Sequence, residues 1–123
     1  MYPADRRYTK DHEWIMVSGT RGKVGITEYA QKQLGDVVFV EAPEAGRSVT
    51  QGETAGTIES VKAVSDLYSP VSCKVIETNP VLGTKPETVN KDPHGTWIFE
   101  IELGDVTEID ALLTGEQYAE LVK

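Results

Sequence analysis

Residues 54–78 read TAGTIESVKAVSDLYSPVSCKVIET, and this stretch decides how the middle of the chain folds. Two runs within it, TAGTIES before the centre and LYSPVSCKVIE after it, are typical of strands. The residues that join them, Val61 to Val64, contain none of the Asn-Gly, Asp-Gly or Gly-Gly pairs that tight hairpins favour. A lysine, Lys62, therefore stands among small apolar residues where the chain has to turn.

Lys62 has two interpretations. A lysine between strands usually keeps an exposed edge or turn soluble. Its neighbours Val61, Ala63 and Val64 are poor turn formers, however, which indicates a requirement other than folding. A primary amine at the tip of a rigid hairpin is the geometry that an acylating enzyme needs, because the side chain projects clear of the sheet. The protein would then present the amine, and an attached cofactor would supply the chemistry.

The rest of the sequence predicts a mainly β fold. An alternation of large apolar residues with glutamates in TWIFEIEL, residues 96–103, is typical of a strand in a sheet with one solvated face. Many short strands with little helix predict a small barrel or sandwich. The other predicted strands are WIMVSG, RGKVGIT, DVVFVEAP, Val49 to Gln51, Glu53 to Glu59, and a strand pair within Leu67 to Thr78.

A short internal helix is predicted within TEYAQKQLG, residues 27–35. Thr27 is a good N-terminal cap, Ala30 and Leu34 fall on one face, and Gly35 stands where a left-handed C-terminal cap would sit. Residues 79–95 hold three of the six prolines, so we expect mostly loop, with one helical turn at Pro86 to Val89.

A second helix is predicted at the C-terminal end. Thr114 and Gln117 match a capping box. Tyr118, Leu121 and Val122 lie three and four positions apart, so they should share the buried face of an amphipathic helix.

The chain has 123 residues and a net charge of −8, from 20 acidic against 12 basic side chains. This length predicts one domain, residues 1–123, with a core that needs neither disulfides nor metal. A negative average field repels phosphate backbones and anionic lipid, so we expect no nucleic-acid or membrane partner. With no signal peptide visible, we expect a soluble monomer in a bacterial cytoplasm rather than a mitochondrial matrix.

Few residues match known catalytic or metal-binding motifs. His12 and His94 lie in no metal-ligand spacing, and the common nucleophile and phosphate-binding motifs are absent from the sequence. The lone Cys73 is best interpreted as an inert strand residue. The carboxylates Asp11, Glu13 and Asp66 could include a general acid and base, although most of the 20 acidic side chains must be solvated.

ESVKAVSDLYSPVS, residues 59–72, resembles the lipoyl-attachment segment of the glycine cleavage system H-protein family. Three further segments are similar to that family in the same order: YTKDHEWI at 8–15, VGITEYAQKQLGDVVFVEAPEAG at 24–46 and VNKDPHG at 89–95. The resemblance covers nearly the whole chain. Lipoyl domains of 2-oxoacid dehydrogenases typically have Asp-Lys-Ala and biotin carriers Met-Lys-Met, whereas here Val61 and Ala63 flank the lysine.

The resemblance implies a barrel-sandwich hybrid, the lipoyl-domain-like fold, and a carrier that is not an enzyme. In the family the lysine, here Lys62, carries lipoic acid in amide linkage. A pyridoxal-phosphate glycine decarboxylase (P protein) passes the aminomethyl group of glycine to the lipoyl arm. A folate-dependent aminomethyltransferase (T protein) then takes the one-carbon unit, and a flavin enzyme, dihydrolipoamide dehydrogenase (L protein), reoxidises the dithiol.

The resemblance also implies roles for four acidic residues. Glu59 matches a family position associated with recognition by the lipoyl-transferring ligase. Glu13 and Asp66 match carboxylates that pair with the ammonium of the loaded arm. Asp11 occupies a position that varies in the family and adds charge near that ammonium. Cys73 departs from the glycine most often found after Pro-Val-Ser.

Three other functions stay open at this point. An H-like protein that donates or relays lipoyl groups to other lipoate-dependent enzymes would carry the same segments, and co-purification with glycine decarboxylase would separate the two. A lipoate-free binding module on the same fold would remain unmodified beside a lipoyl ligase. A small acid-base enzyme using Glu13 and Asp66 would turn over without any modification.

Overall fold

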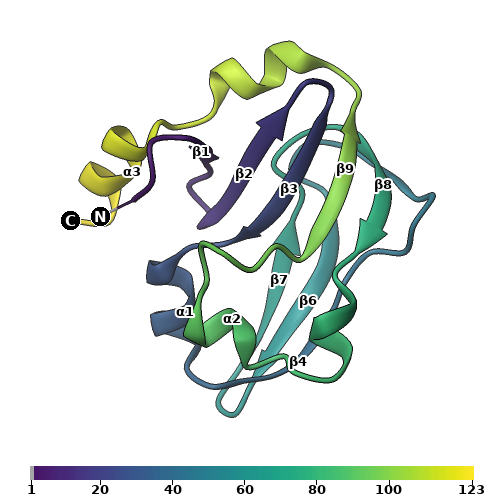
Figure 1. The fold of residues 1–123 in the computed structure, drawn as a ribbon. Coiled ribbons are helices and arrows are strands. Elements are labelled where there is room, and N and C mark those ends of the chain that lie inside the picture. Colours follow the sequence, from purple (N-terminus) through teal and green to yellow (C-terminus); the bar gives the residue numbers. More distant parts are fainter. Residues whose placement is uncertain (1) are drawn as a thin grey trace.

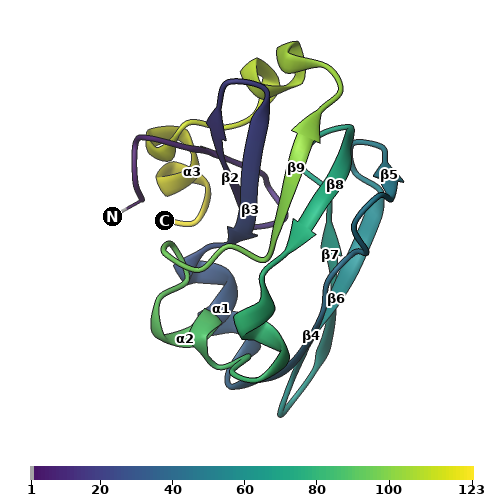
Figure 2. The same ribbon diagram turned by 45° about the vertical axis from the view of Figure 1, so that its right-hand side comes forward.

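The computed structural model describes residues 2–123, which form two antiparallel sheets facing each other as two layers (Figures 1 and 2). The six-stranded sheet has the order β1-β2-β3-β9-β8-β5, with β1 Arg7–Tyr8, β2 Glu13–Ser18, β3 Arg21–Ile26, β9 Phe99–Leu103, β8 Cys73–Thr78 and β5 Ser48–Val49. The three-stranded sheet has the order β4-β6-β7, with β4 Val37–Glu41, β6 Thr54–Ser60 and β7 Val64–Tyr68.

The α-helices are short and lie outside the two sheets. They are α1 Glu28–Leu34, α2 Thr88–Lys91 and α3 Gly115–Leu121, accompanied by 3-10 turns at η1 Pro80–Gly83 and η2 Val106–Ala111. None of the helices within residues 2–123 has the length and apolar character needed to cross a membrane.

The internal helix α1 forms as predicted. Thr27 Oγ1 accepts the backbone N–H of Ala30, which satisfies one of the free donors of the first turn. Gly35 ends the helix at φ 79°, a backbone conformation that side chains with a Cβ rarely adopt. Leu34 is buried against the main core, so the helix is held by packing as well as by its caps.

The main core lies between the two sheets. Each sheet turns one face inward, and burial of a large apolar side chain contributes roughly 1.5–3 kcal/mol relative to leaving it exposed. The core therefore fixes the smaller sheet, and with it the β6–β7 hairpin, onto the larger one. Its most buried members include Ile15, Val24, Val75, Phe99 and Ile101 of the larger sheet and Ile58 and Leu67 of the smaller one.

A separate aromatic cluster holds the two ends of the chain together. Tyr8 stacks on Tyr118 at 4.9 Å between ring centroids, and Tyr2 meets Tyr118 edge-on at 4.8 Å. Tyr8 also exchanges backbone hydrogen bonds with Leu113. Both ends of the chain therefore lie side by side next to α3, away from the tip of the β6–β7 hairpin (Figure 1).

The predicted fold class is confirmed. The structure is mainly β, with a short internal helix, a C-terminal helix and two sheets arranged as the barrel-sandwich hybrid. The capping box of α3 is also present: the hydroxyl of Thr114 accepts the N–H of Gln117, and the side chain of Gln117 accepts the N–H of Thr114.

Two predicted strands are shorter in the structure. The strand expected at 96–103 begins only at Phe99, because Ile98 and Phe99 are adjacent and both fully buried, which breaks the alternation. The strand expected at 49–51 ends at Val49. Thr50 and Gln51 donate their N–H groups to the side chains of Glu53 and Ser72 instead of to a neighbouring strand.

The predicted helical segments differ in detail. The single turn expected at 86–89 is α2, shifted to Thr88–Lys91, and the 3-10 turn η1 was not foreseen. Asn79 starts η1 by accepting the N–H of Val81 with its side chain. Leu121 is 52% exposed although we expected it to be buried, because Tyr118 is the side chain of α3 that reaches the aromatic cluster.

Candidate functional site

The turn between β6 and β7 consists of Val61, Lys62 and Ala63. The Ser60 hydroxyl accepts the N–H groups of Ala63 at 3.1 Å and Lys62 at 3.3 Å, so a side chain closes the turn. Val61 donates its own N–H to the carbonyl of Asp36 at 3.0 Å, which ties the tip to the segment after α1. The turn is therefore closed without a glycine and without hydrogen bonds from the side chains of Val61 and Lys62.

Lys62 is exposed at this tip, as predicted. Among residues 2–123 its Nζ has no ion pair, so no bond within the protein has to break before the amine reacts. Its aliphatic stem passes close to Gly35, where an added Cβ would lie 3.3 Å from Lys62 Cε. The lysine thus leaves the turn beside the C-terminal end of α1.

A cavity of about 300 Å³ lies between α1, the start of β2 and β7, next to the hairpin. Asp11, Glu13 and Asp66 all line it, so the structure brings together the three carboxylates singled out in the sequence. Their roles stay predictions, but their proximity could not be read from positions so far apart in the chain. The apolar part of the lining comes from Ile26, Ala30, Leu34, Ile58, Ala63, Val64 and Leu67.

Glu13 is the buried member of this set, with 2% of its surface exposed. Burial raises the pKa of its carboxyl group to about 8, against the opposing effect of hydrogen bonds from the Thr9 hydroxyl at 2.6 Å and the Tyr68 N–H at 3.3 Å. At neutral pH this carboxyl group is therefore mostly protonated. A cation that enters the cavity would favour the charged form.

Asp11 and Asp66 are exposed, in contrast to Glu13. Glu59 lies elsewhere: it is exposed on β6, on the outer face of the three-stranded sheet, between Phe39 of β4 and Val64 of β7. Of the four predicted acidic residues, Asp11, Glu13 and Asp66 line the cavity and Glu59 does not. Ligase recognition by Glu59 remains a prediction that its exposure permits.

His12 also lines the cavity, although its place in the sequence matches no metal-ligand motif and gave no indication of a site. Its φ of 73° places it in the left-handed region, and its Nδ1 lies 2.8 Å from the Tyr118 hydroxyl. That hydroxyl also lies 2.7 Å from Thr27 Oγ1, at the N-terminal cap of α1. Burial lowers the pKa of His12, so the ring is neutral at physiological pH and links α3, α1 and β2.

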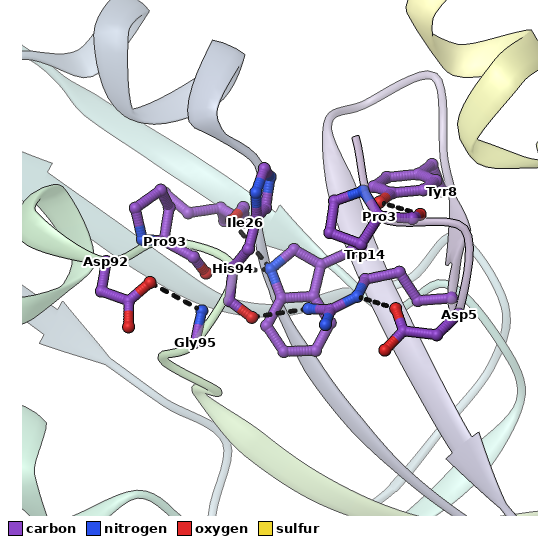
Figure 3. Close-up of polar contacts among 10 residues, drawn as sticks. Pro3, Asp5, Tyr8, Trp14, Ile26, Asp92, Pro93, His94 and Gly95 are labelled. Atoms are coloured by element: carbon purple, nitrogen blue, oxygen red, sulfur yellow. Dashed lines mark hydrogen bonds and ion pairs between the residues drawn. The ribbon is translucent and has the colours of Figure 1, made fainter. Parts of the chain in front are cut away.

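The loop at residues 92–95 is fixed against β2 by Trp14 (Figure 3). The indole Nε1–H is shared between the carbonyls of Ile26 at 2.9 Å and Pro93 at 3.0 Å. Arg6 covers the indole ring at 4.6 Å and donates to the carbonyl of His94 at 2.6 Å. His94 Nε2 in turn accepts the N–H of Glu28, so this loop supports the first turn of α1 and thereby one wall of the cavity.

A second cavity of about 310 Å³ also borders Glu13, and includes the aromatic residues Tyr8 and Tyr68. Glu13 and Asp11 line both cavities. The Tyr68 N–H that binds Glu13 lies at the end of β7, the second strand of the hairpin, so the buried carboxyl group ties β2 to β7 beside both cavities.

Comparisons with known proteins agree over almost the entire chain. The family model described as the glycine cleavage H-protein matches residues 6–123. The glycine cleavage system H protein of Acidobacterium capsulatum is 52% identical over 122 residues, covering 99% of this chain and 95% of that protein. The protein of the same name from Symbiobacterium thermophilum is 54% identical over 122 residues, covering 98% and 95%. A crystal structure of a glycine cleavage system H protein from Mycobacterium marinum matches with a TM-score of 0.88 and 41% identity, covering 96% of each chain.

Proposed function

The chain belongs to the glycine cleavage H-protein family, and we propose that Lys62 is the residue that carries its lipoyl group. The family is the lipoyl-carrying shuttle of the glycine cleavage system, so the chain is a carrier protein of that system. The observation that supports Lys62 is its position: an exposed amine with no ion pair to residues 2–123, at the tip of a hairpin closed by Ser60, within the segment ESVKAVSD.

The surroundings of Lys62 fit a lipoyl group. Acylation removes the charge of the lysine, so the modified side chain is mostly hydrocarbon and sulfur. The apolar lining of the neighbouring cavity, which includes Leu34, Ile58 and Leu67, suits such a chain. When bound, the lipoyl group would supply a redox-active pair of sulfur atoms, which form a ring when oxidised and can carry the one-carbon group once the ring is opened. The protein itself would take no catalytic step.

Glu13 and Asp66 would hold the cationic end of the cargo. Both carboxyl groups line the cavity, Glu13 buried and Asp66 exposed. Glu13 is neutral before a cation arrives, which avoids a buried unpaired charge, and it would lose its proton when an ammonium group binds. Asp11 lines the same cavity and adds to its negative potential. Water is scarce around a buried carboxyl group, so cargo held there would hydrolyse slowly.

We expect the partners to be glycine decarboxylase, the aminomethyltransferase, dihydrolipoamide dehydrogenase and a lipoyl-transferring ligase. A tethered group meets each docked active site at an effective concentration of about millimolar. Residues 1–123 would act as one carrier domain that visits these enzymes in turn. This explains why a small protein presents one reactive amine on a rigid hairpin.

Intact mass spectrometry after coexpression with a lipoyl ligase and lipoate tests this proposal. We expect the wild-type chain to gain the mass of one lipoyl group. Lys62→Arg keeps the positive charge but should gain nothing, and Lys85→Arg, at an exposed lysine outside the hairpin, should be modified like the wild type. A lipoylated Lys62→Arg variant, or an unmodified wild-type chain, would contradict the assignment of Lys62.

A further inference from the structure

Exposed apolar side chains gather around Lys62. Six large apolar residues among residues 2–123 are exposed, and four of them lie on β4 or at the β6–β7 hairpin. Phe39, Glu59 and Val64 form one cross-strand row, so their side chains share the outer face of the three-stranded sheet. The four exposed apolar residues, which we call the hairpin patch, are Val38 (47% exposed), Phe39 (52%), Val61 (69%) and Val64 (67%).

Folding does not account for the hairpin patch. The turn is closed by the Ser60 hydroxyl and by backbone groups, so a polar residue at Val61 or Val64 would leave its hydrogen bonds intact. Isolated exposed apolar residues are normal on a protein surface, but a group of them gathered at one place indicates an interaction site. Lys62, whose amine has to enter other enzymes, stands between Val61 and Val64 at the tip of the same hairpin.

Carboxylates accompany the hairpin patch. Glu59 lies within its central row, and the next row on the same face pairs Glu41 with Thr57 and Thr57 with Asp66, which stands on the edge strand β7 and also borders the cavity. Asp36 precedes β4, and its carbonyl accepts the N–H of Val61. All four carboxylates are exposed, and none of them takes part in an ion pair within residues 2–123.

The hairpin patch has one basic residue within its three strands. Lys62 is the only lysine or arginine in 37–41 and 54–68, and acylation would abolish its charge. The modified face would then present apolar side chains beside carboxylates with no cation on these strands. Such a face is complementary to an apolar recess bordered by arginine and lysine.

We propose that the hairpin patch and its carboxylates form the docking surface for the entrance of an arm-accepting active site, an apolar recess bordered by basic residues. Because the arm starts next to Val61 at the hairpin tip, an enzyme that admits it can contact Val61, Phe39 and Val64 together. This inference rests on the proposed carrier function and deepens it by naming the surface and the chemistry of the partner. Because every enzyme that accepts the arm would use this one surface, only one of them can bind at a time.

Binding of the unlipoylated chain to purified glycine decarboxylase tests the docking surface without requiring turnover. We expect Phe39→Ser and Val61→Ser each to weaken binding about tenfold, as loss of a central apolar contact does. Val61→Ser changes a residue of the turn whose side chain supports no strand, so it stays informative if Phe39→Ser unfolds. Val106→Ser, at a residue 55% exposed on η2, is the matched control and should bind like the wild type.

Charge reversal tests the acidic part of the surface. We expect Glu41→Lys to weaken binding several-fold at about 50 mM salt, with a smaller effect at about 200 mM because salt screens exposed charges. Glu77→Lys makes the same charge change on β8 of the other sheet and should leave binding unchanged. After lipoylation, the variants that bind more weakly should also show a higher KM when they serve as the carrier substrate of the decarboxylase. Their kcat should stay close to the wild-type value.

Two results would overturn the docking surface while the carrier function stands. One is a lipoylated, active wild-type chain whose variants at positions 39, 61 and 41 all bind the decarboxylase like the wild type. The other is a concentration-dependent dimer of the wild-type chain that Phe39→Ser abolishes, since a second copy would then be the occupant. A wild-type chain that gains no lipoyl group and does not bind the decarboxylase would overturn both proposals together.

Discussion

Glu13 places a buried carboxyl group at the wall of the cavity. Its carboxyl group is 2% exposed, receives hydrogen bonds from Thr9 and Tyr68, and has a pKa raised to about 8 by burial. A carboxyl group of this kind is costly for a fold at neutral pH, because the unfolded chain would release the proton that the folded chain keeps. We propose that Glu13 meets this cost because its carboxyl group pairs with the cargo.

We expect Glu13→Gln to remove a pH dependence of stability. The folded-state pKa is raised, so between the unfolded value near 4.5 and the folded value near 8 the folded state binds more protons, and the free energy of unfolding falls as pH rises. From pH 5 to pH 8 the wild type should lose about 3 kcal/mol relative to Glu13→Gln, at about 1.36 kcal/mol per pH unit. Urea unfolding of both proteins at several pH values measures this difference.

The two histidines supply an internal control for that measurement. Burial lowers the pKa of His12 and His94, which makes stability rise with pH near their titration, the opposite sign from Glu13. Both histidines are present in both proteins, so their effect cancels in the comparison. Equal pH slopes for the wild type and Glu13→Gln would show that the carboxyl group does not carry this penalty.

The β6–β7 hairpin shows how far an element can be predicted from its sequence. The two strands were predicted from their β-branched residues, and the absence of a glycine turn indicated that the tip was unusual. The sequence does contain an indication of how the turn is closed, namely Ser60, because a serine directly before a turn often accepts backbone N–H groups. The start of β7 at Val64 rather than Leu67 follows from this serine, because it shortens the turn to three residues.

We expect Ser60→Ala to loosen the hairpin without unfolding the protein. The change removes the acceptor of two backbone N–H groups and should lower the free energy of unfolding by about 1–2 kcal/mol. Hydrogen exchange at the Ala63 N–H should speed up more than exchange in the core strands. Ser65→Ala, on exposed β7, is the control, and equal exchange at Ala63 in both variants would refute the role of the Ser60 hydroxyl.

At the scale of the whole molecule, the sequence predicts individual helices and strands better than it predicts the sites that form where distant elements pack together. Local patterns and a family resemblance were enough for the two-sheet fold, α1 with its caps and the capping box of α3. The cavity was not predictable from local pattern, because it forms where β2, α1 and β7 meet through long-range packing. The burial of Glu13 and the contact of His12 with Tyr118 depend on that packing in the same way.

The assembled cavity leads to a prediction about retention of cargo. We expect the double variant Glu13→Gln, Asp66→Asn to lose the one-carbon unit from isolated, loaded protein about tenfold faster than the wild type. Charge-assisted hydrogen bonds of roughly 1.5–3 kcal/mol are lost when both carboxylates are neutralised. Mass spectrometry of the loaded protein over time measures the decay.

Two distant carboxylates provide the control for this decay. Glu77→Gln combined with Asp110→Asn makes the same two replacements of a carboxyl group by an amide at exposed positions on β8 and η2, outside the cavity, and should decay at the wild-type rate. If the cavity variant decays no faster than this control, then Glu13 and Asp66 do not protect the cargo.

The aromatic cluster that gathers Tyr2, Tyr8 and Tyr118 has a practical consequence. It keeps both ends of the polypeptide together on the side of the molecule away from the hairpin tip. A bead, a fluorophore or a fused enzyme attached at either end would therefore leave the tip of the hairpin pointing into solution. The same layout would let tandem copies be joined in one polypeptide, each with its hairpin tip unobstructed.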